Sequence, residues 1–156
     1  MSNANANANA FVEAIESART AAYDDGAALV ARAVTEWLAE FRPTAGTVLL
    51  AALATQGITA YSGDDFGMSY VIPLDPATPG PDVRNHLHLS IGDRNPSVDH
   101  VPAAHTGWTA FLYDEDGSPV GAPVFTSGDG TTPVDCAADS GAAARALAAF
   151  LANPTR

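Results

Sequence analysis

Two histidines separated by a single residue are the feature of this sequence that most directly suggests chemistry. His86 and His88 occur in a segment where apolar and polar residues alternate. Successive side chains of a strand point to opposite faces, so the two imidazoles of an extended segment project from the same side. Asp93, His100 or His105 would complete a facial two-histidine, one-carboxylate set, of the kind that holds first-row transition metals. The pattern therefore nominates His86, His88 and Asp93 as metal ligands.

Two known families share parts of this pattern. His86-Leu87-His88 followed by Asp93 resembles the first half of the cupin metal motif, although cupins usually have Glu as the acid. No second histidine motif follows Trp108, and five strands are too few for a full jelly roll. His88-Leu89-Ser90 resembles one unit of the two-histidine phosphoesterases, but His105-Thr106-Gly107 does not supply the second unit. Neither resemblance assigns the chain to a family.

The segment around the histidine pair determines where its imidazoles point. Residues 83–91 alternate in a way that predicts a strand, whose apolar face consists of Val83, Leu87, Leu89 and Ile91. The opposite face carries both histidines, and we expect it to be solvated. Residues 92–106 then form a connection at the upper limit of length for a compact domain, and loops of this length often carry function.

The other elements are indicated by the periodicity of apolar residues and by capping residues. Helical spacing predicts helices over residues 10–23 and 27–41, and a third helix that begins after the cap Thr44 and ends at Gly57. Period-two patterns predict strands over residues 58–61, 68–74, 83–91, 108–113 and 120–126. Pro119 and Pro123 place the last strand at a sheet edge. A final helix begins at a cap provided by Asp135 or Asp139 and ends near Leu151.

This order of elements predicts an α+β fold. It consists of N-terminal helices, an antiparallel β-meander of four to five strands and a C-terminal helix packed on the sheet. Residues 1–9, which are rich in Asn-Ala pairs, are expected to form a flexible leader, and residues 10–156 a single α+β domain.

The charge is strongly negative and concentrated in the middle of the chain. Eighteen acidic residues face seven arginines and no lysine, which gives a formal charge of −11. Residues 61–139 contain twelve of the acids and only Arg84 and Arg94 as cations. Direct binding to nucleic acid or to an anionic membrane needs clustered cations, so both are disfavoured. The charge instead favours a protein partner, in particular a basic one.

An aromatic surface on the sheet is the second candidate site. If Trp108, Ala110 and Leu112 face the helices, the residues between them face outward and lie near Val71. Acids in the following turn would rim this surface. The predicted interface residues are Val71, Phe111, Tyr113, Asp114, Glu115 and Asp116.

These observations predict a small acidic accessory protein, more consistent with a non-enzymatic role than with an enzyme, that acts by protein–protein contact. One version is charge mimicry against a basic nucleic-acid-binding partner. The alternative is a metal-binding protein or metal-dependent enzyme that uses His86 and His88. A third reading, small-ligand binding between sheet and helices, rests on Trp37 and Tyr70. No cofactor is predicted.

Cysteine usage and composition bear on the compartment and origin. Cys136 is the single cysteine, so it has no internal disulfide partner, and the adjacent Asp135 opposes formation of a thiolate. The start of the chain lacks the basic and apolar regions of a secretory signal. We therefore expect a cytoplasmic protein. The absence of lysine and the abundance of alanine suggest a GC-rich bacterium or a mobile element as its source.

Overall fold

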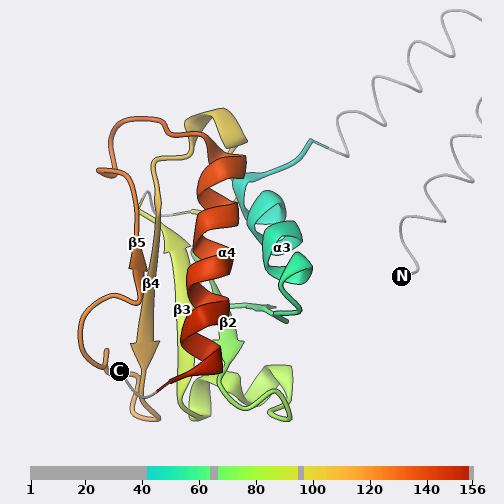
Figure 1. The fold of residues 1–156 in the computed structure, drawn as a ribbon, viewed down its shortest axis with the longest axis vertical. Coiled ribbons are helices and arrows are strands. Elements are labelled where there is room, and N and C mark those ends of the chain that lie inside the picture. The colour runs from blue at the N-terminus through green and yellow to red at the C-terminus, as the bar shows by residue number, and fades with distance from the viewer. Residues whose placement is uncertain (1–41, 64–66, 95–96, 155–156) are drawn as a thin grey trace, which may run out of the picture. The chain divides into compact units, whose positions relative to one another are not determined.

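The computed structural model describes residues 42–63, 67–94 and 97–154, whose arrangement is drawn in Figure 1. This part of the chain contains helix α3 (Ala45–Thr55), a five-stranded antiparallel sheet and helix α4 (Cys136–Ala152). The predicted α+β class is therefore confirmed. The predicted leader and the helices predicted over residues 10–23 and 27–41 lie outside the described residues. Neither α3 nor α4 is long and apolar enough to cross a membrane.

The sheet is a meander in which every strand pairs with its neighbour in sequence. Its order is β1 (Tyr61–Ser62), β2 (Ser69–Pro73), β3 (His88–Asp93), β4 (Trp108–Tyr113) and β5 (Phe125–Thr126), and all pairs are antiparallel. The predicted strand over residues 108–113 has the observed bounds. The strand predicted over residues 120–126 is reduced to β5 at the sheet edge, and an isolated bridge pairs Pro119 with Tyr113.

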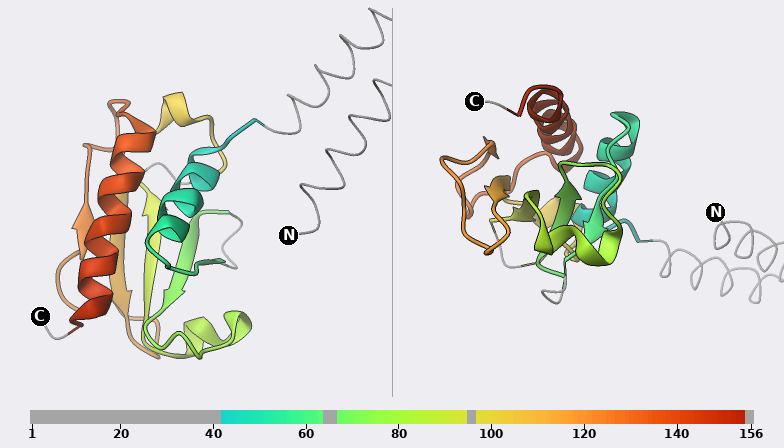
Figure 2. Two further views of the ribbon diagram at one scale, coloured as in Figure 1. Left: turned by 45° about the vertical axis from the view of Figure 1, so that its right-hand side comes forward. Right: turned by 90° about the horizontal axis from the view of Figure 1, so that it is seen from below.

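One face of the sheet packs against both helices. Figure 2 shows α3 and α4 on the same side of the sheet, where the two helices also contact each other. Alternate residues of β2, β3 and β4 point toward them and are almost completely buried: Tyr70, Ile72, Leu89, Ile91, Trp108 and Ala110. The helices contribute Leu49, Leu53, Ala143 and Leu147 to the same core. Burial of each large apolar side chain contributes about 1.5–3 kcal/mol.

The helix caps agree with the sequence. Thr44 forms a reciprocal capping box with Thr47 at the start of α3. Asp135 caps α4, where its carboxylate accepts hydrogen bonds from the backbone N–H groups of Ala137 and Ala138. From the sequence, either Asp135 or Asp139 is predicted to cap this helix. Because Asp135 is the cap, the carboxylate of Asp139 in the first turn of α4 is available for other contacts.

The predicted strand over residues 83–91 is wrong in its first half. Residues Gly80–Asn85 form a 3-10 helix, η1, which is preceded by Pro79 and contains Pro81. Proline fixes φ near −65° and removes a donor, so it favours this turn over an extended strand. The strand therefore begins only at His88. Leu87, expected in the core, is 40% exposed, whereas Val83 is buried from its position in η1.

The sheet face opposite the helices is partly covered. Tyr61, Val71, Ser90 and Phe111 are register partners and so share this face. Gly80 of η1 lies against the ring of Tyr61, and Val71 is only 2% exposed. The expectation of an exposed Val71 is therefore wrong.

The two histidines of the pair differ in exposure. His88 does point away from the helices, but it is only 4% exposed, because its ring stacks on Tyr113 with 5.7 Å between centroids. The expectation of a solvated His88 is wrong, whereas His86 is exposed. Phe111 and Tyr113 are half-buried.

Candidate metal centre

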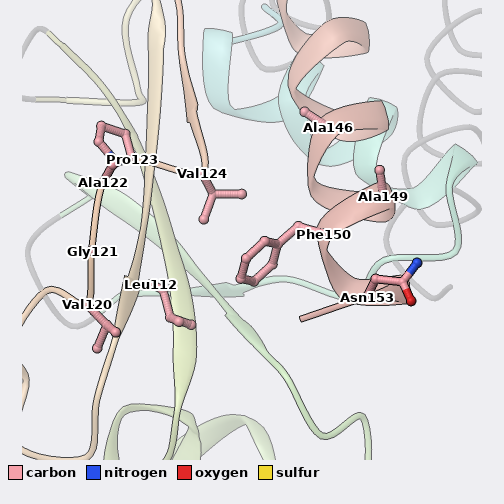
Figure 3. Close-up of a pocket in the computed structure, with 10 residues that line it drawn as sticks. All are labelled: Leu112, Val120, Gly121, Ala122, Pro123, Val124, Ala146, Ala149, Phe150 and Asn153. Atoms are coloured by element: carbon pink, nitrogen blue, oxygen red, sulfur yellow. The ribbon is translucent and has the colours of Figure 1, made fainter. Parts of the chain in front are cut away.

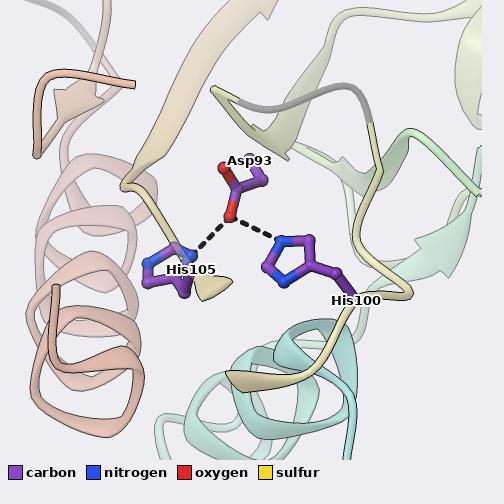
Figure 4. Close-up of side chains that lie close together, drawn as sticks. All are labelled: Asp93, His100 and His105. Carbon is purple, nitrogen blue, oxygen red and sulfur yellow. Dashed lines mark hydrogen bonds and ion pairs between the residues drawn. The ribbon is translucent and has the colours of Figure 1, made fainter. Parts of the chain in front are cut away.

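A cluster of two histidines and an aspartate lies between the end of β3 and the start of β4. As Figure 4 shows, the imidazoles of His100 and His105 both point at the carboxylate of Asp93. Asp93 Oδ2 lies 2.8 Å from His100 Nε2 and 2.5 Å from His105 Nδ1. One potential ligand atom from each of the three residues lies within 4.8 Å of the other two. We call Asp93, His100 and His105 the triad.

The sheet register and the following loop bring the triad together. Asp93 ends β3 and is the register partner of Trp108, which begins β4. The connection between these strands carries both histidines. Its path is fixed by α3, because the backbone N–H of Ala45 donates to the carbonyl of His100. His105 follows the short 3-10 helix η2 (Pro102–Ala104), and its carbonyl accepts from the N–H of Val134.

Each member of the triad has its second polar atom held by another group. His100 Nδ1 lies 3.0 Å from the carbonyl of Val101, and His105 Nε2 lies 2.8 Å from Asp139 Oδ2. The hydroxyl of Thr106 donates to Asp93 Oδ1 over 2.9 Å. An imidazole that donates through its outer nitrogen to a carbonyl or carboxylate directs its inner nitrogen toward the centre. This is the arrangement that orients histidine ligands in metal sites.

Asp139 connects the triad to α4, β4 and the residues after β5. Its Oδ2 accepts hydrogen bonds from Ser127 Oγ over 2.7 Å and from the Trp108 backbone N–H over 3.2 Å, besides that from His105. The ring of Trp108 packs on His105 with 4.4 Å between centroids, and its indole N–H donates to Ser140 Oγ. The imidazole of His105 is therefore held by Asp93 at one nitrogen, by Asp139 at the other, and by the ring of Trp108.

The triad is almost completely shielded from solvent. The side chains of Asp93 and His105 are 0% exposed and that of His100 is 16% exposed. The two carboxylates of Asp93 and Asp139 both contact His105 in this shielded region. Buried charges need compensation, and a divalent cation between neutral imidazoles would supply two positive charges.

The structure does not bring His86 and His88 together with Asp93. His88 begins β3 and Asp93 ends it, and five residue steps along a strand span about 16 Å. His88 Nδ1 instead lies 2.8 Å from the carbonyl of His86. Asp93 instead contacts two other histidines, His100 and His105. From the sequence, these two residues are expected only to add to a site that contains His86 and His88.

Some acidic side chains in the middle of the chain, including that of the predicted interface residue Asp114, accept hydrogen bonds within their own turns. Asp114 closes its turn, where Oδ1 accepts from the backbone N–H groups of Asp116 and Ser118. Asp129 likewise accepts from Thr131 and Thr132. Glu115 and Asp116 are exposed at the tip of the turn. Some of the acidic residues, namely Asp114, Asp129 and Asp135, therefore stabilise turns and a helix cap.

The single cysteine lies beside the cluster, in the first turn of α4. Cys136 is buried, and this burial raises the pKa of its thiol, as do the neighbouring charges of Asp139, Asp93 and Asp135, while a contact with Ser140 opposes the shift. The raised pKa of this thiol agrees with the prediction that thiolate formation is opposed.

A groove lies near the other end of α4. It has a volume of about 610 Å³ and runs between α4 and the residues before β5 (Figure 3). Its lining includes Leu112, Val120, Val124 and Phe150, and Asn153 contributes the only side-chain amide.

Comparisons with protein-family models, with curated proteins and with solved structures found no match. The function must therefore be inferred from the residues of this chain.

Proposed function

We propose that this protein binds a divalent transition-metal ion, with zinc as the reference metal, through Asp93 Oδ2, His100 Nε2 and His105 Nδ1. The observation that carries the proposal is the convergence of these three atoms, two of them on wholly buried side chains. Two nitrogens and one carboxylate oxygen suit zinc and its first-row neighbours, whereas Ca²⁺ and Mg²⁺ prefer oxygen ligands alone.

The geometry supports this with a small adjustment. Ligand atoms at 2.0–2.2 Å from a tetrahedral ion are about 3.4 Å apart. The two contacts of Asp93 Oδ2 measure 2.5 and 2.8 Å, so this oxygen needs to move away from each nitrogen by less than about 1 Å. The two nitrogens lie within 4.8 Å of each other, so they need to approach by at most about 1.4 Å. The outer contacts of the triad, to Val101, Thr106 and Asp139, are compatible with this movement because they lie on the far sides of the three groups.

The four histidines of the chain provide a matched test. His100 belongs to the triad and is partly exposed, whereas His86 is exposed and lies outside it. Metal-free wild-type protein and the variants His100→Ala and His86→Ala are titrated with Zn²⁺ by calorimetry. We expect one zinc ion per wild-type chain and an unchanged affinity in His86→Ala. His100→Ala should lose about 100-fold or more, because even partners outside the ligand set contribute 10- to 100-fold.

A second set of variants guards against misfolding. Circular dichroism checks that His100→Ala retains its fold, and Thr106→Val keeps all three ligands but removes the donor to Asp93. We expect about tenfold weaker binding in Thr106→Val. The proposal is contradicted if the wild type binds no stoichiometric zinc ion, or if His100→Ala and His86→Ala bind zinc with equal affinity. The triad would then be a hydrogen-bonded structural cluster that holds no metal.

The contact function expected from the sequence is a second proposal. It is supported by the exposed carboxylates of Glu115 and Asp116, which lie in the turn that follows the half-buried Tyr113. Its test is binding of a basic, arginine-rich peptide to the wild type and to Glu115→Gln/Asp116→Asn at several salt concentrations. We expect weaker binding and a smaller salt dependence in the variant. Binding that is insensitive to both changes contradicts the proposal.

A further inference from the structure

We infer that an ion held by the triad keeps one coordination position open toward solvent, and that this position takes water or another neutral donor such as an imidazole ring. The inference rests on the proposed metal binding and goes beyond it, because it distinguishes an exchangeable centre from a closed structural one. Structural zinc sites have four protein ligands, whereas sites with three protein ligands leave a position for an external one.

The number of available protein ligands is the first argument. In the part of the chain that the structure describes, the group of converging ligand atoms contains only Asp93, His100 and His105. Asp93 Oδ2 is the oxygen that faces both nitrogens, whereas Oδ1 accepts from Thr106. A fourth ligand for a tetrahedral ion must therefore come from outside this set.

Asp139 is the nearby carboxylate that needs separate consideration. Its Oδ2 contacts Nε2 of His105, while Nδ1 of the same ring faces the centre. The imidazole ring thus separates this carboxylate from the ion. Ser127 and the backbone of Trp108 hold the same oxygen in place. Asp139 therefore orients His105 and does not bind the ion.

Exposure indicates where the open position lies. The side chains of Asp93 and His105 are 0% exposed, and His100, at 16%, is the member of the triad in contact with solvent. The external ligand consequently approaches along the side of His100. Because the other two side chains are fully buried, we expect a small molecule or the end of one side chain as this ligand.

The charge of the centre selects the kind of external ligand. A divalent ion together with the carboxylates of Asp93 and Asp139 carries no net charge. A neutral donor leaves this balance unchanged, whereas an anion adds an uncompensated negative charge at a buried position, which is costly. We therefore expect imidazole to bind more tightly than a small anion such as azide.

Cobalt substitution tests the inference directly. Co²⁺ is added in place of zinc to wild-type protein and to His86→Ala, and the visible bands of cobalt are followed during separate titrations with imidazole and azide at constant ionic strength. We expect saturable band shifts with imidazole in both proteins, and azide should need at least tenfold higher concentrations. Metal analysis after each titration must still give one cobalt ion per chain.

A charge variant provides the second readout. Asp139→Asn leaves the centre with one net positive charge, so the affinity for azide should rise about tenfold relative to the wild type, as expected for removal of one charge several ångströms away at intermediate dielectric. This prediction concerns the external ligand, so it holds even where Asp139→Asn binds cobalt less tightly, provided that the variant is loaded.

The outcomes separate the two proposals. A wild-type protein that takes up no cobalt contradicts the proposed metal binding, and the open position with it. A protein with one bound cobalt whose spectrum changes with neither ligand contradicts the open position alone. Tighter binding of azide than of imidazole to the wild type contradicts the charge argument.

Discussion

Truncation of Asp139 tests how strongly the cluster joins α4 to the sheet. Asp139→Ala removes an acceptor of three hydrogen bonds. Two of the donors keep a partner, since the Trp108 N–H still donates to Ser127 Oγ and Ser127 Oγ to the Trp108 carbonyl. The buried Nε2 of His105 loses the one partner recorded for it. The variant therefore leaves an unsatisfied donor on a residue with 0% exposure.

The expected magnitude follows from these contacts. A hydrogen bond to a charged group contributes about 1.5–3 kcal/mol, and leaving its buried partner unsatisfied places the cost at the upper end. An acid in the first turn of a helix adds about 0.3–1 kcal/mol. We expect a loss of about 3 kcal/mol in the free energy of unfolding. For a domain of this size that corresponds to a Tm lower by about 12 °C.

Urea denaturation in the presence of a chelator measures this loss without a contribution from bound metal. Asp116→Ala is the control, because Asp116 is exposed in a turn, and it should change the unfolding free energy by no more than about 0.5 kcal/mol. A loss below about 1 kcal/mol in Asp139→Ala, with an unchanged m-value, would refute the view that this carboxylate secures His105.

Two further predictions concern Gly107 and Asp129. Gly107 has φ of +129°, and a Cβ there would collide with the carbonyl oxygen of Ser127, whereas Gly117 has φ of +75° and open space around it. In urea denaturation, Gly107→Ala should therefore lower the free energy of unfolding by about 3 kcal/mol or more. Gly117→Ala should lower it by only about 1–2 kcal/mol, which is the cost of backbone strain alone. Equal losses in the two variants would contradict the collision at residue 107. The backbone N–H groups of Thr132 and Thr131 hold the pKa of Asp129 well below its usual range. That stabilisation is present above about pH 4 and is lost as the pH falls through the lowered pKa. The difference in unfolding free energy between wild type and Asp129→Asn should therefore shrink below about pH 3. A difference that grows on acidification would contradict this prediction.

The parts of the fold that the sequence predicted depend on short-range chemistry. Thr44 and Asp135 cap their helices through side-chain contacts within three residues. The strand over residues 108–113 shows its alternation without interruption by proline. The strand over residues 83–91 failed because its alternation continued into a segment whose conformation is governed by Pro79 and Pro81. Periodicity alone does not reveal that a proline-rich turn has replaced the first half of a strand.

The candidate site was only partly predictable because its contacts cross long stretches of sequence. Asp93 was nominated, and the long connection after it drew attention to His100 and His105. Their convergence depends on the register that pairs Asp93 with Trp108. The contribution of Asp139 comes from a helix far along the chain. From the sequence alone, Asp139 looks like an alternative helix cap, and nothing near it in the sequence indicates a contact with His105.

The order of these contacts along the chain has a consequence for biosynthesis. Asp93, His100 and His105 leave the ribosome close together, and β3 and β4 can pair soon afterwards because only one connection separates them. The carboxylate that contacts His105 Nε2 follows later in the chain, with α4. The nascent chain thus presents Asp93, His100 and His105 before Asp139, so these three side chains can meet before Asp139 holds the outer nitrogen of His105.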